Sequence, residues 1–312
     1  MTINALPDLL ATELAQPAAP GAQALAAELA RRGGAATSAV LYYGSALRAG
    51  ELDGILDFYV LLDDVGAWPA SILARLANRL LPPNVGYLEF PHQGQTLRAK
   101  YALMSTAQFA RRLTANSLDT TIWARFCQPA LLVWSRSAAD RDAAVDLVSR
   151  AVDCAAGWAA RLGPATGQAE EFWRALFART YAAELRVEKA ARALDIVGQA
   201  PARYAALLPL AWDRCGVQYT TGAEDLLVPQ ISPAQRAHGA RSWVWRARLG
   251  RPLNILRLLK AACTFAGAMD YAVWKVARHS GVHVEVAPWQ RRFPLLAAPG
   301  LYFKLRRLGL FK

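Results

Sequence analysis

The sequence predicts an α+β fold, in which a mixed sheet with flanking helices is followed by a mainly helical C-terminal domain. Short apolar runs bounded by turn residues occupy the first third, which is typical of buried strands. After Ser137 the apolar residues recur at helical spacing. With 312 residues, 54% of them hydrophobic, the chain can bury two packed cores. We expect a helical lead-in over 1–35, a sheet domain over 36–136 and a helical domain over 137–312.

The lead-in is rich in alanine and ends at Gly33-Gly34. It lacks a basic start and carries acids, so it resembles neither a secretory signal nor a mitochondrial presequence. Because no run of about 18 apolar residues occurs, we expect no membrane-spanning helix.

Four strands and one helix are expected in the sheet domain. The strands are Ser38–Tyr43, Ile55–Leu62, Gly86–Phe90 and Leu97–Ser105. Between the second and third strands, Trp68–Leu81 has apolar residues at helical spacing: Ile72, Leu73, Leu76 and Leu80.

Three helices are expected in the C-terminal domain, over Glu170–Val197, Arg241–Leu259 and Ala261–Arg278. The strongest pattern is that of Glu170–Val197, where one apolar stripe follows the helical period. Gly216–Pro233 is predicted to be a loop, and prolines interrupt the tail.

The net charge of +12 is concentrated at the end of the chain. Residues 236–312 contain fifteen Lys or Arg and only two acids, Asp270 and Glu285. Such an asymmetry favours an anionic partner, either lipid head groups, nucleic acid or a polyphosphate, over a merely soluble basic surface.

Neither a structural metal nor a disulfide framework is indicated. The four cysteines are far apart with no C-x-x-C pair, and the four histidines have no metal-ligand spacing. We therefore expect free, buried thiols.

The pattern richest in chemistry is a Gly-Ser bend followed by an acid. Gly44-Ser45 ends the first strand, and Asp57 follows inside the apolar second strand. A small residue lets a phosphate approach backbone amides, and a buried carboxylate nearby can hold Mg²⁺ against a triphosphate. This is the logic of the nucleotidyltransferase fold, although the usual second acid is absent at Ile55 and Tyr59. The alternative is that Asp57 is satisfied by an arginine or by backbone amides.

Four blocks in register resemble the Tam41-type CTP:phosphatidate cytidylyltransferases. The first block, Tyr43-Gly44-Ser45 with Ile55-Leu56-Asp57-Phe58, Asp63-Asp64 and Ala67-Trp68, resembles that family's YGSG, MLDF, VDD and AWH. The others are Leu97–Ala102, Glu171–Val197 and Arg251–Lys275, similar to IKYGV, LSYxGDxRM with NIV, and RPSS with TKGIFTAG. The family also lacks the second strand acid. Departures include Ala46, Ala102, Glu89, Gln128 and Ala183 where the family has Gly, Gly, Asn, Lys and Gly.

The resemblance implies site residues and a reaction, the Mg²⁺-dependent transfer of CMP from CTP to phosphatidate, giving CDP-diacylglycerol and pyrophosphate. The implied catalytic residues are Asp57, which would bind the metal, and Lys100. The implied nucleotide-binding residues are Tyr43, Gly44, Ser45, Lys100 and Tyr101. The implied lipid-binding residues are Tyr181, Glu184, Arg186, Arg251, Lys260 and Lys275. Candidates for a second metal-binding acid are Asp53, Asp63 and Glu89.

A peripheral position on the inner face of the cell membrane, in the cytoplasm, fits this reaction. The tail over 301–312 interleaves apolar and basic residues, and Trp243, Trp245, Trp274 and Trp289 add amphipathic rings, although these groups could equally pack within the protein. Nucleic acid is the less favoured partner, because no RNP-like or zinc-finger motif is present, although a basic helical domain beside a nucleotidyltransferase core also suits a tRNA-modifying enzyme. The alternatives are a nucleotidyltransferase acting on RNA or protein, and a non-catalytic protein that binds anionic lipid.

Overall fold

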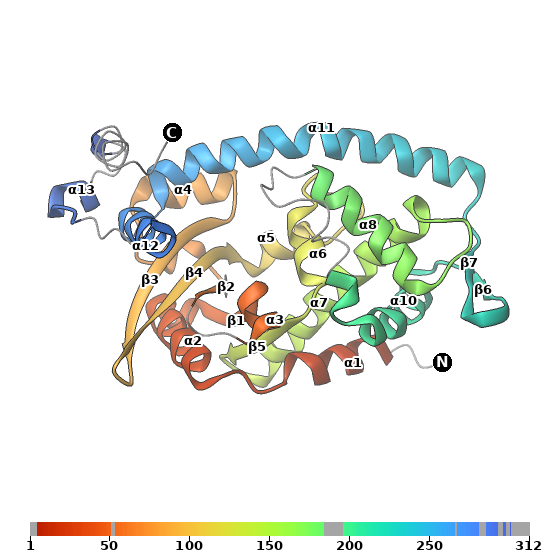
Figure 1. The fold of residues 1–312 in the computed structure, drawn as a ribbon, viewed down its shortest axis with the longest axis horizontal. Helices are drawn as coiled ribbons and strands as arrows, with labels where there is room; N and C mark the ends of the chain where they lie inside the picture. The colour runs from red at the N-terminus through yellow and green to blue at the C-terminus, as the bar shows by residue number, and fades with distance from the viewer. Residues whose placement is uncertain are drawn as a thin grey trace. The chain divides into compact units, whose positions relative to one another are not determined.

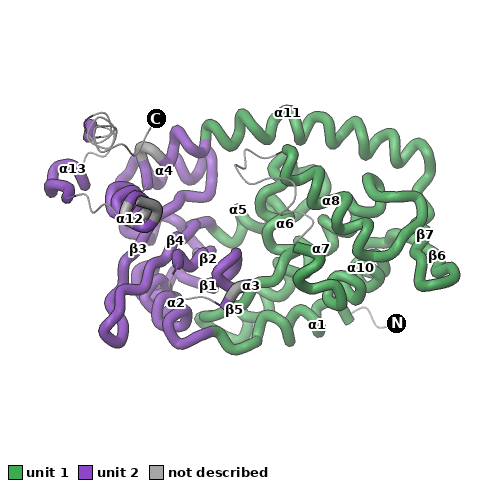
Figure 2. The backbone as a smooth tube through the Cα atoms, in the orientation of Figure 1, with its two compact units in different colours: residues 1–18, 105–256 green, residues 19–104, 257–312 purple. Residues whose placement is uncertain are grey.

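The computed structural model describes residues 5–50, 54–183, 196–265, 267–280, 285–292, 296–297 and 300. The chain forms two compact units, coloured separately in Figure 2. Unit 1 comprises Met1–Ala18 and Ser105–Leu256, and unit 2 comprises Ala19–Met104 and Arg257–Lys312. The mixed α/β architecture expected from the sequence is confirmed. The domain boundaries placed after residues 35 and 136 stay a prediction.

Unit 2 contains four strands of the fold, in the spatial order β3-β4-β2-β1 (Figure 1). Their bounds are β1 Thr37–Tyr43, β2 Ile55–Leu62, β3 Asn84–His92 and β4 Gln95–Ser105. The pairs β1/β2 and β3/β4 are antiparallel. The last pair continues to His92 and Gln95, so the hairpin turn is only Gln93-Gly94. Both turn residues have positive φ, as a tight two-residue hairpin turn requires.

Helices flank these strands within unit 2. They are α2 Pro20–Gly33, α3 Ser45–Ala49, α4 Ile72–Leu80, the end of α11 (Pro233–Thr264), α12 Ala268–Ser280 and α13 Pro288–Arg292. Proline at the first turn of α2 suits a helix start, and its apolar face, with Leu25 and Leu29, is fully buried. It packs against β1, whose residues Thr37–Tyr42 are buried, so the core of this unit lies between them.

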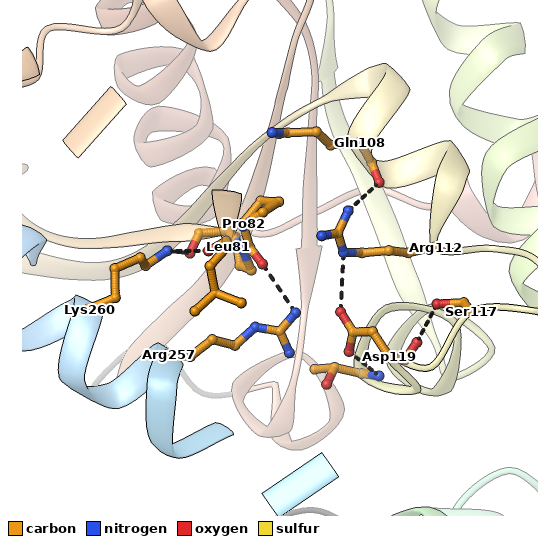
Figure 3. Close-up of polar contacts among 10 residues, drawn as sticks. Leu81, Pro82, Gln108, Arg112, Ser117, Asp119, Arg257 and Lys260 are labelled. Atoms are coloured by element: carbon orange, nitrogen blue, oxygen red, sulfur yellow. Dashed lines mark hydrogen bonds and ion pairs between the residues drawn. The ribbon is translucent and has the colours of Figure 1, made fainter. Parts of the chain in front are cut away.

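Unit 1 is mainly helical. Its elements are α1 Ala5–Leu14, α5 Thr106–Arg111, α6 Thr121–Phe126, β5 Ala130–Ser135, α7 Ala138–Leu162, α8 Ala169–Ala183, α10 Pro201–Cys215, β6 Tyr219–Thr221, β7 Leu227–Pro229 and the first part of α11. Its core is aromatic: Trp173 and Trp212 are fully buried and donate their indole N–H groups to the carbonyls of Tyr204 and Ala156. Arg112 joins α5 to the following loop by donating to the Gln108 carbonyl and to Asp119 (Figure 3).

The structure corrects several sequence-based boundaries. The lead-in contains two helices, α1 and α2, separated at Ala15–Ala19 around Pro17. The predicted break near residue 260 is wrong, because α11 continues to Thr264 and α12 begins at Ala268, directly after Gly267, which has a φ of 76°. The predicted loop over 216–233 contains the hairpin β6/β7. The helix expected over 170–197 is α8 as far as Ala183, and 184–195 lie outside the described residues.

Two further expectations concern the membrane and the thiols. Among the helices that the structure describes, none is both long and apolar enough to cross a bilayer. Cys127 and Cys154 are buried free thiols, and burial raises the pKa of each to about 12. Cys215 is free but exposed, contrary to the expectation of burial.

Candidate active site

The Gly-Ser bend and Asp57 lie against each other. Strand β1 ends at Tyr43, which pairs with Asp57 across the antiparallel ladder, and Gly44 then turns the chain into α3 at Ser45. Gly44 has φ 100° and ψ −167°, a conformation that is essentially restricted to glycine. A Cβ atom added to Gly44 would lie 3.0 Å from Oδ2 of Asp57. The carboxylate therefore sits directly beside the bend that the sequence singled out.

A pocket of about 350 Å³ opens at this bend. It lies entirely within unit 2, and three of its lining residues are ones predicted for the site: Ser45, Asp57 and Lys100. Lys100 reaches it from β4, which neighbours β2 in the sheet. Among the described residues, those that line the pocket are Ser45, Ala46, Gly54, Ile55, Asp57, Lys100, Tyr271, Trp274 and Arg278. Asp57 was expected to be buried in the strand, but it is only half-buried because it faces this pocket.

Helix α12 supplies one wall of the pocket. Tyr271, Trp274 and Arg278 follow one another at i, i+3 and i+7, so they share one helix face. The helix packs against β3, which lies beneath it in Figure 1. At its start, a Cβ on Gly267 would be 2.8 Å from the carbonyl oxygen of Tyr87, so glycine permits the close approach. The ring of Tyr87 also contacts that of Tyr271, with 5.7 Å between the centroids.

Two cations and two aromatic rings are among the described residues that line the pocket. Lys100 and Arg278 provide two positive charges against the carboxylate of Asp57. The guanidinium carbons of Arg278 and Arg98 lie 5.4 and 5.7 Å from the centroid of the Trp274 ring, within cation–π range. Such a lining suits a ligand that carries phosphates and a planar ring.

Burial keeps the tyrosine behind the bend protonated. It raises the pKa of Tyr42 to about 12, and the nearby carboxylate of Asp57 adds to the shift by opposing a second negative charge. Tyr42 stacks on Phe58 at 5.1 Å between centroids. Tyr42 is therefore neutral and packed, and Asp57 is the acid among the described residues that line the pocket.

The two candidate acids that the structure describes, Asp63 and Glu89, do not reach Asp57. Asp63 is exposed beyond the opposite end of β2, six residues away, which is about 20 Å along a strand. Glu89 accepts from the hydroxyl of Tyr87 and pairs with Arg98 at 3.3 Å. Asp53 lies outside the described residues. In the described part of the chain, no three His, Cys, Asp or Glu side chains cluster as a metal site.

One carboxylate is nevertheless enough for the metal that the sequence predicts. Mg²⁺ commonly binds through one or two carboxylates, with the remaining positions filled by water and by substrate phosphate oxygens. Asp57 is half-buried, faces an open pocket and stands beside a bend free of side-chain bulk. The residues present therefore fit a magnesium ion that arrives with a nucleotide.

Two predicted nucleotide-binding tyrosines do not line the pocket. Tyr101 alternates with Lys100 on β4, so it points to the opposite face of the sheet, where it is buried against Trp68 at 5.4 Å. Burial raises its pKa. Tyr43 is half-buried, with its ring 5.5 Å from that of Tyr59. Their positions favour a packing role for both.

The predicted lipid-binding residues are dispersed. Tyr181 and Arg251 belong to unit 1, where the first is half-buried and the second is exposed. Lys260 donates to the carbonyls of Leu81 and Pro83 and to the side chain of Asn84, so it holds α11 to the loop after α4 (Figure 3). Lys275 lies in α12, but the structure does not describe its side chain. Glu184 and Arg186 lie outside the described residues.

Sequence reasoning missed the contribution of α12 to the pocket. The helix itself was expected, and the aromatic–aromatic–arginine spacing of Tyr271, Trp274 and Arg278 was a usable signal for a functional face. Trp274 was instead considered as a membrane-facing ring.

No known family model and no curated protein matches this chain. The resemblance to the cytidylyltransferases therefore rests on its four sequence blocks, and the activity that it implies is a proposal.

Proposed function

We propose that this protein transfers CMP from CTP to phosphatidate, in a Mg²⁺-dependent reaction that gives CDP-diacylglycerol and pyrophosphate. The observation that carries the proposal is the convergence of Ser45, Asp57 and Lys100 on one pocket in unit 2. These residues come from three separate elements, and they are those for which the cytidylyltransferase resemblance implies a role. The added cation and aromatic ring of α12 complement a nucleotide.

The chain's residues would act mainly by positioning. The open bend at Gly44 and the hydroxyl of Ser45 would receive the triphosphate, and Lys100 and Arg278 would counter its charge. Asp57 would hold magnesium, which when bound supplies charge neutralisation at the phosphates. A phosphatidate oxygen forms a bond to the α-phosphorus of CTP, the bond from that phosphorus to the bridging oxygen breaks, and pyrophosphate leaves with the electron pair. Orientation and electrostatic stabilisation supply the rate enhancement.

The acceptor is an amphiphile, so the proposed enzyme would work at a membrane surface, on the cytoplasmic side and peripherally. The excess of cations near the C-terminus supports an anionic surface as partner. The basic and apolar tail over 301–312, which was predicted to be a membrane anchor, lies outside the described residues.

The experiment is a transfer assay with purified protein, Mg²⁺, phosphatidate vesicles and each labelled nucleoside triphosphate in turn. We expect the label of CTP to enter the lipid, and Asp57→Asn to lower the rate at least about 100-fold because the carboxylate that would hold the magnesium ion is lost. Asp63→Asn is the matched control, because that carboxylate lies at the far end of the same strand and is exposed. Its rate should equal that of the wild type.

The same assay decides against the proposal in two ways. Label found in RNA or protein, with none in lipid, would identify a nucleotidyltransferase with another acceptor. No transfer under any condition, with vesicle binding intact, would identify a non-catalytic protein that binds anionic lipid.

A further inference from the structure

Helix α4 exposes a continuous set of large aliphatic side chains. Its four large apolar residues are all strongly exposed: Ile72 by 75%, Leu73 by 61%, Leu76 by 51% and Leu80 by 86%. They recur at the spacing of one face of this nine-residue helix. A grouped apolar face of this kind marks a contact surface, whereas single exposed leucines need no explanation.

Hydrogen bonds made by the opposite face of α4 fix the orientation of the helix. Its buried residues are Ala74 and Asn78. The Asn78 side chain donates to the carbonyl of Leu103 at 3.0 Å, and Asn84 donates to the carbonyl of Ala74 at 2.7 Å. Ser71 caps the first turn by accepting from the amide of Ala74. The polar, hydrogen-bonded face is therefore fixed to unit 2, and the aliphatic face is held outward.

The exposed face is also basic. Arg75 and Arg79 are both exposed on α4, and the helix contains no acid. In the part of the chain that the structure describes, no carboxylate forms an ion pair with either guanidinium. Aliphatic side chains with arginines beside them suit the boundary of an anionic bilayer, where the alkyl groups enter the acyl region and guanidinium groups meet lipid phosphates.

The surface extends onto the end of α11. Arg257 donates to the carbonyl of Pro82 at 3.1 Å, and Lys260 donates to that of Leu81, so this end of the helix is fixed beside the loop that follows α4 (Figure 3). Between these two anchors, Leu258 and Leu259 are exposed. Both anchoring cations are used in holding the helix, which leaves the arginines of α4 to meet an external anion.

We propose that α4 is a membrane-docking helix, which inserts Ile72, Leu73, Leu76 and Leu80 at the surface of an anionic bilayer while Arg75 and Arg79 contact lipid phosphates. Helix α4 would be the surface through which the proposed enzyme reaches its lipid, so this proposal rests on the proposed function. Vesicle binding is measured without nucleotide, so membrane docking and nucleotide transfer can each be refuted without the other.

The experiment is flotation of the full chain with vesicles of phosphatidylcholine alone or mixed with phosphatidylglycerol. Leu76→Ser combined with Leu80→Ser should weaken binding to the mixed vesicles at least about tenfold, since two inserted alkyl groups are lost. Leu9→Ser combined with Leu118→Ser is the matched control, because it removes two exposed leucines of unit 1, and it should bind like the wild type. Arg75→Gln combined with Arg79→Gln should weaken binding to the mixed vesicles and leave binding to neutral vesicles unchanged.

Because the substituted leucines are exposed, the variants should keep the wild-type urea midpoint and circular dichroism, which verifies that they fold. Unchanged flotation of Leu76→Ser with Leu80→Ser would overturn the proposal. So would a change from dimer to monomer in sedimentation with vesicle binding intact, which would identify a second copy of the chain as the partner of α4. If flotation falls as expected while no nucleotide is transferred, docking stands and the proposed reaction fails. If CMP is transferred to dispersed short-chain phosphatidate while the leucine changes leave flotation unaffected, the proposed reaction stands and docking through α4 fails.

Discussion

Replacing Gly44 by alanine tests whether the Gly-Ser bend and Asp57 act as one unit. An alanine held at φ 100° and ψ −167° would be strained by about 3 kcal/mol, the upper end of the range for residues in sparsely populated backbone conformations. The new methyl group would also lie 3.0 Å from Oδ2 of Asp57, so the carboxylate must shift by a few tenths of an ångström. Because catalysis tolerates little misplacement, we expect Gly44→Ala to lower transfer about 100-fold.

Gly50→Ala is the matched control for this change. Gly50 ends the same short helix α3 in the left-handed conformation, with φ 69° and ψ 17°, and a Cβ there would meet no atom within 4 Å. It should cost about 1 kcal/mol of unfolding free energy and leave transfer unchanged. Urea denaturation and the labelled-CTP assay measure the two effects. If both alanine variants lost activity equally, or if Gly44→Ala kept full activity, the assignment of Asp57 to the bend would be refuted.

Three further predictions follow from the described contacts. Arg278→Gln should weaken CTP binding at least about tenfold by equilibrium dialysis, since a pocket cation is lost, whereas Arg31→Gln, which removes an exposed cation of unit 2, should not. Trp212→Ala should lower the free energy of unfolding by roughly 3–5 kcal/mol in urea, because it empties a fully buried site and removes the indole hydrogen bond to the carbonyl of Ala156. Burial raises the pKa of Asp153 from 3.8 to about 6, so the folded protein binds this proton more tightly than the unfolded chain does. The free energy of unfolding of the wild type, compared with that of Asp153→Asn, should therefore fall as the pH rises from about 4 to 6. Urea denaturation measures this, and the same pH dependence in both proteins would contradict it.

The sequence predicted the centre of the site because its parts are local. Gly44 directly follows β1 and Asp57 lies in β2, and these two strands are consecutive along the chain and pair antiparallel, with Tyr43 opposite Asp57. Lys100 was found only through the family resemblance, since a single lysine in a strand carries no signal of its own. Successive side chains of a strand point to opposite faces of the sheet, so Lys100 faces the pocket and Tyr101 is buried in the core. The family resemblance implied a nucleotide-binding role for both residues and did not distinguish them.

The remaining wall of the pocket depends on contacts between distant segments. Gly267 and Tyr271 meet Tyr87 across about 180 residues of chain, and no periodicity within either segment reports that meeting. The outward face of α4 was hidden for a different reason. Its apolar spacing predicted a helix correctly, but spacing alone does not say whether the stripe or the Ala74–Asn78 face is buried. The hydrogen bonds made by Asn78 and Asn84 decide that orientation.

Among the described residues that line the pocket, the one carboxylate, that of Asp57, is consistent with a reaction between two anions. Asp57 is balanced by Lys100 and Arg278, so the described lining has one positive charge in excess before any metal binds. A second acid at the position of Ile55 would cancel that excess, although it would hold a metal more tightly. In the proposed transfer both the triphosphate and the attacking phosphate are negative, and bringing them together is opposed by their repulsion. A described lining with a net positive charge lowers this repulsion, and a lone acid costs metal affinity, so the nucleotide itself must then bring oxygen ligands for the ion.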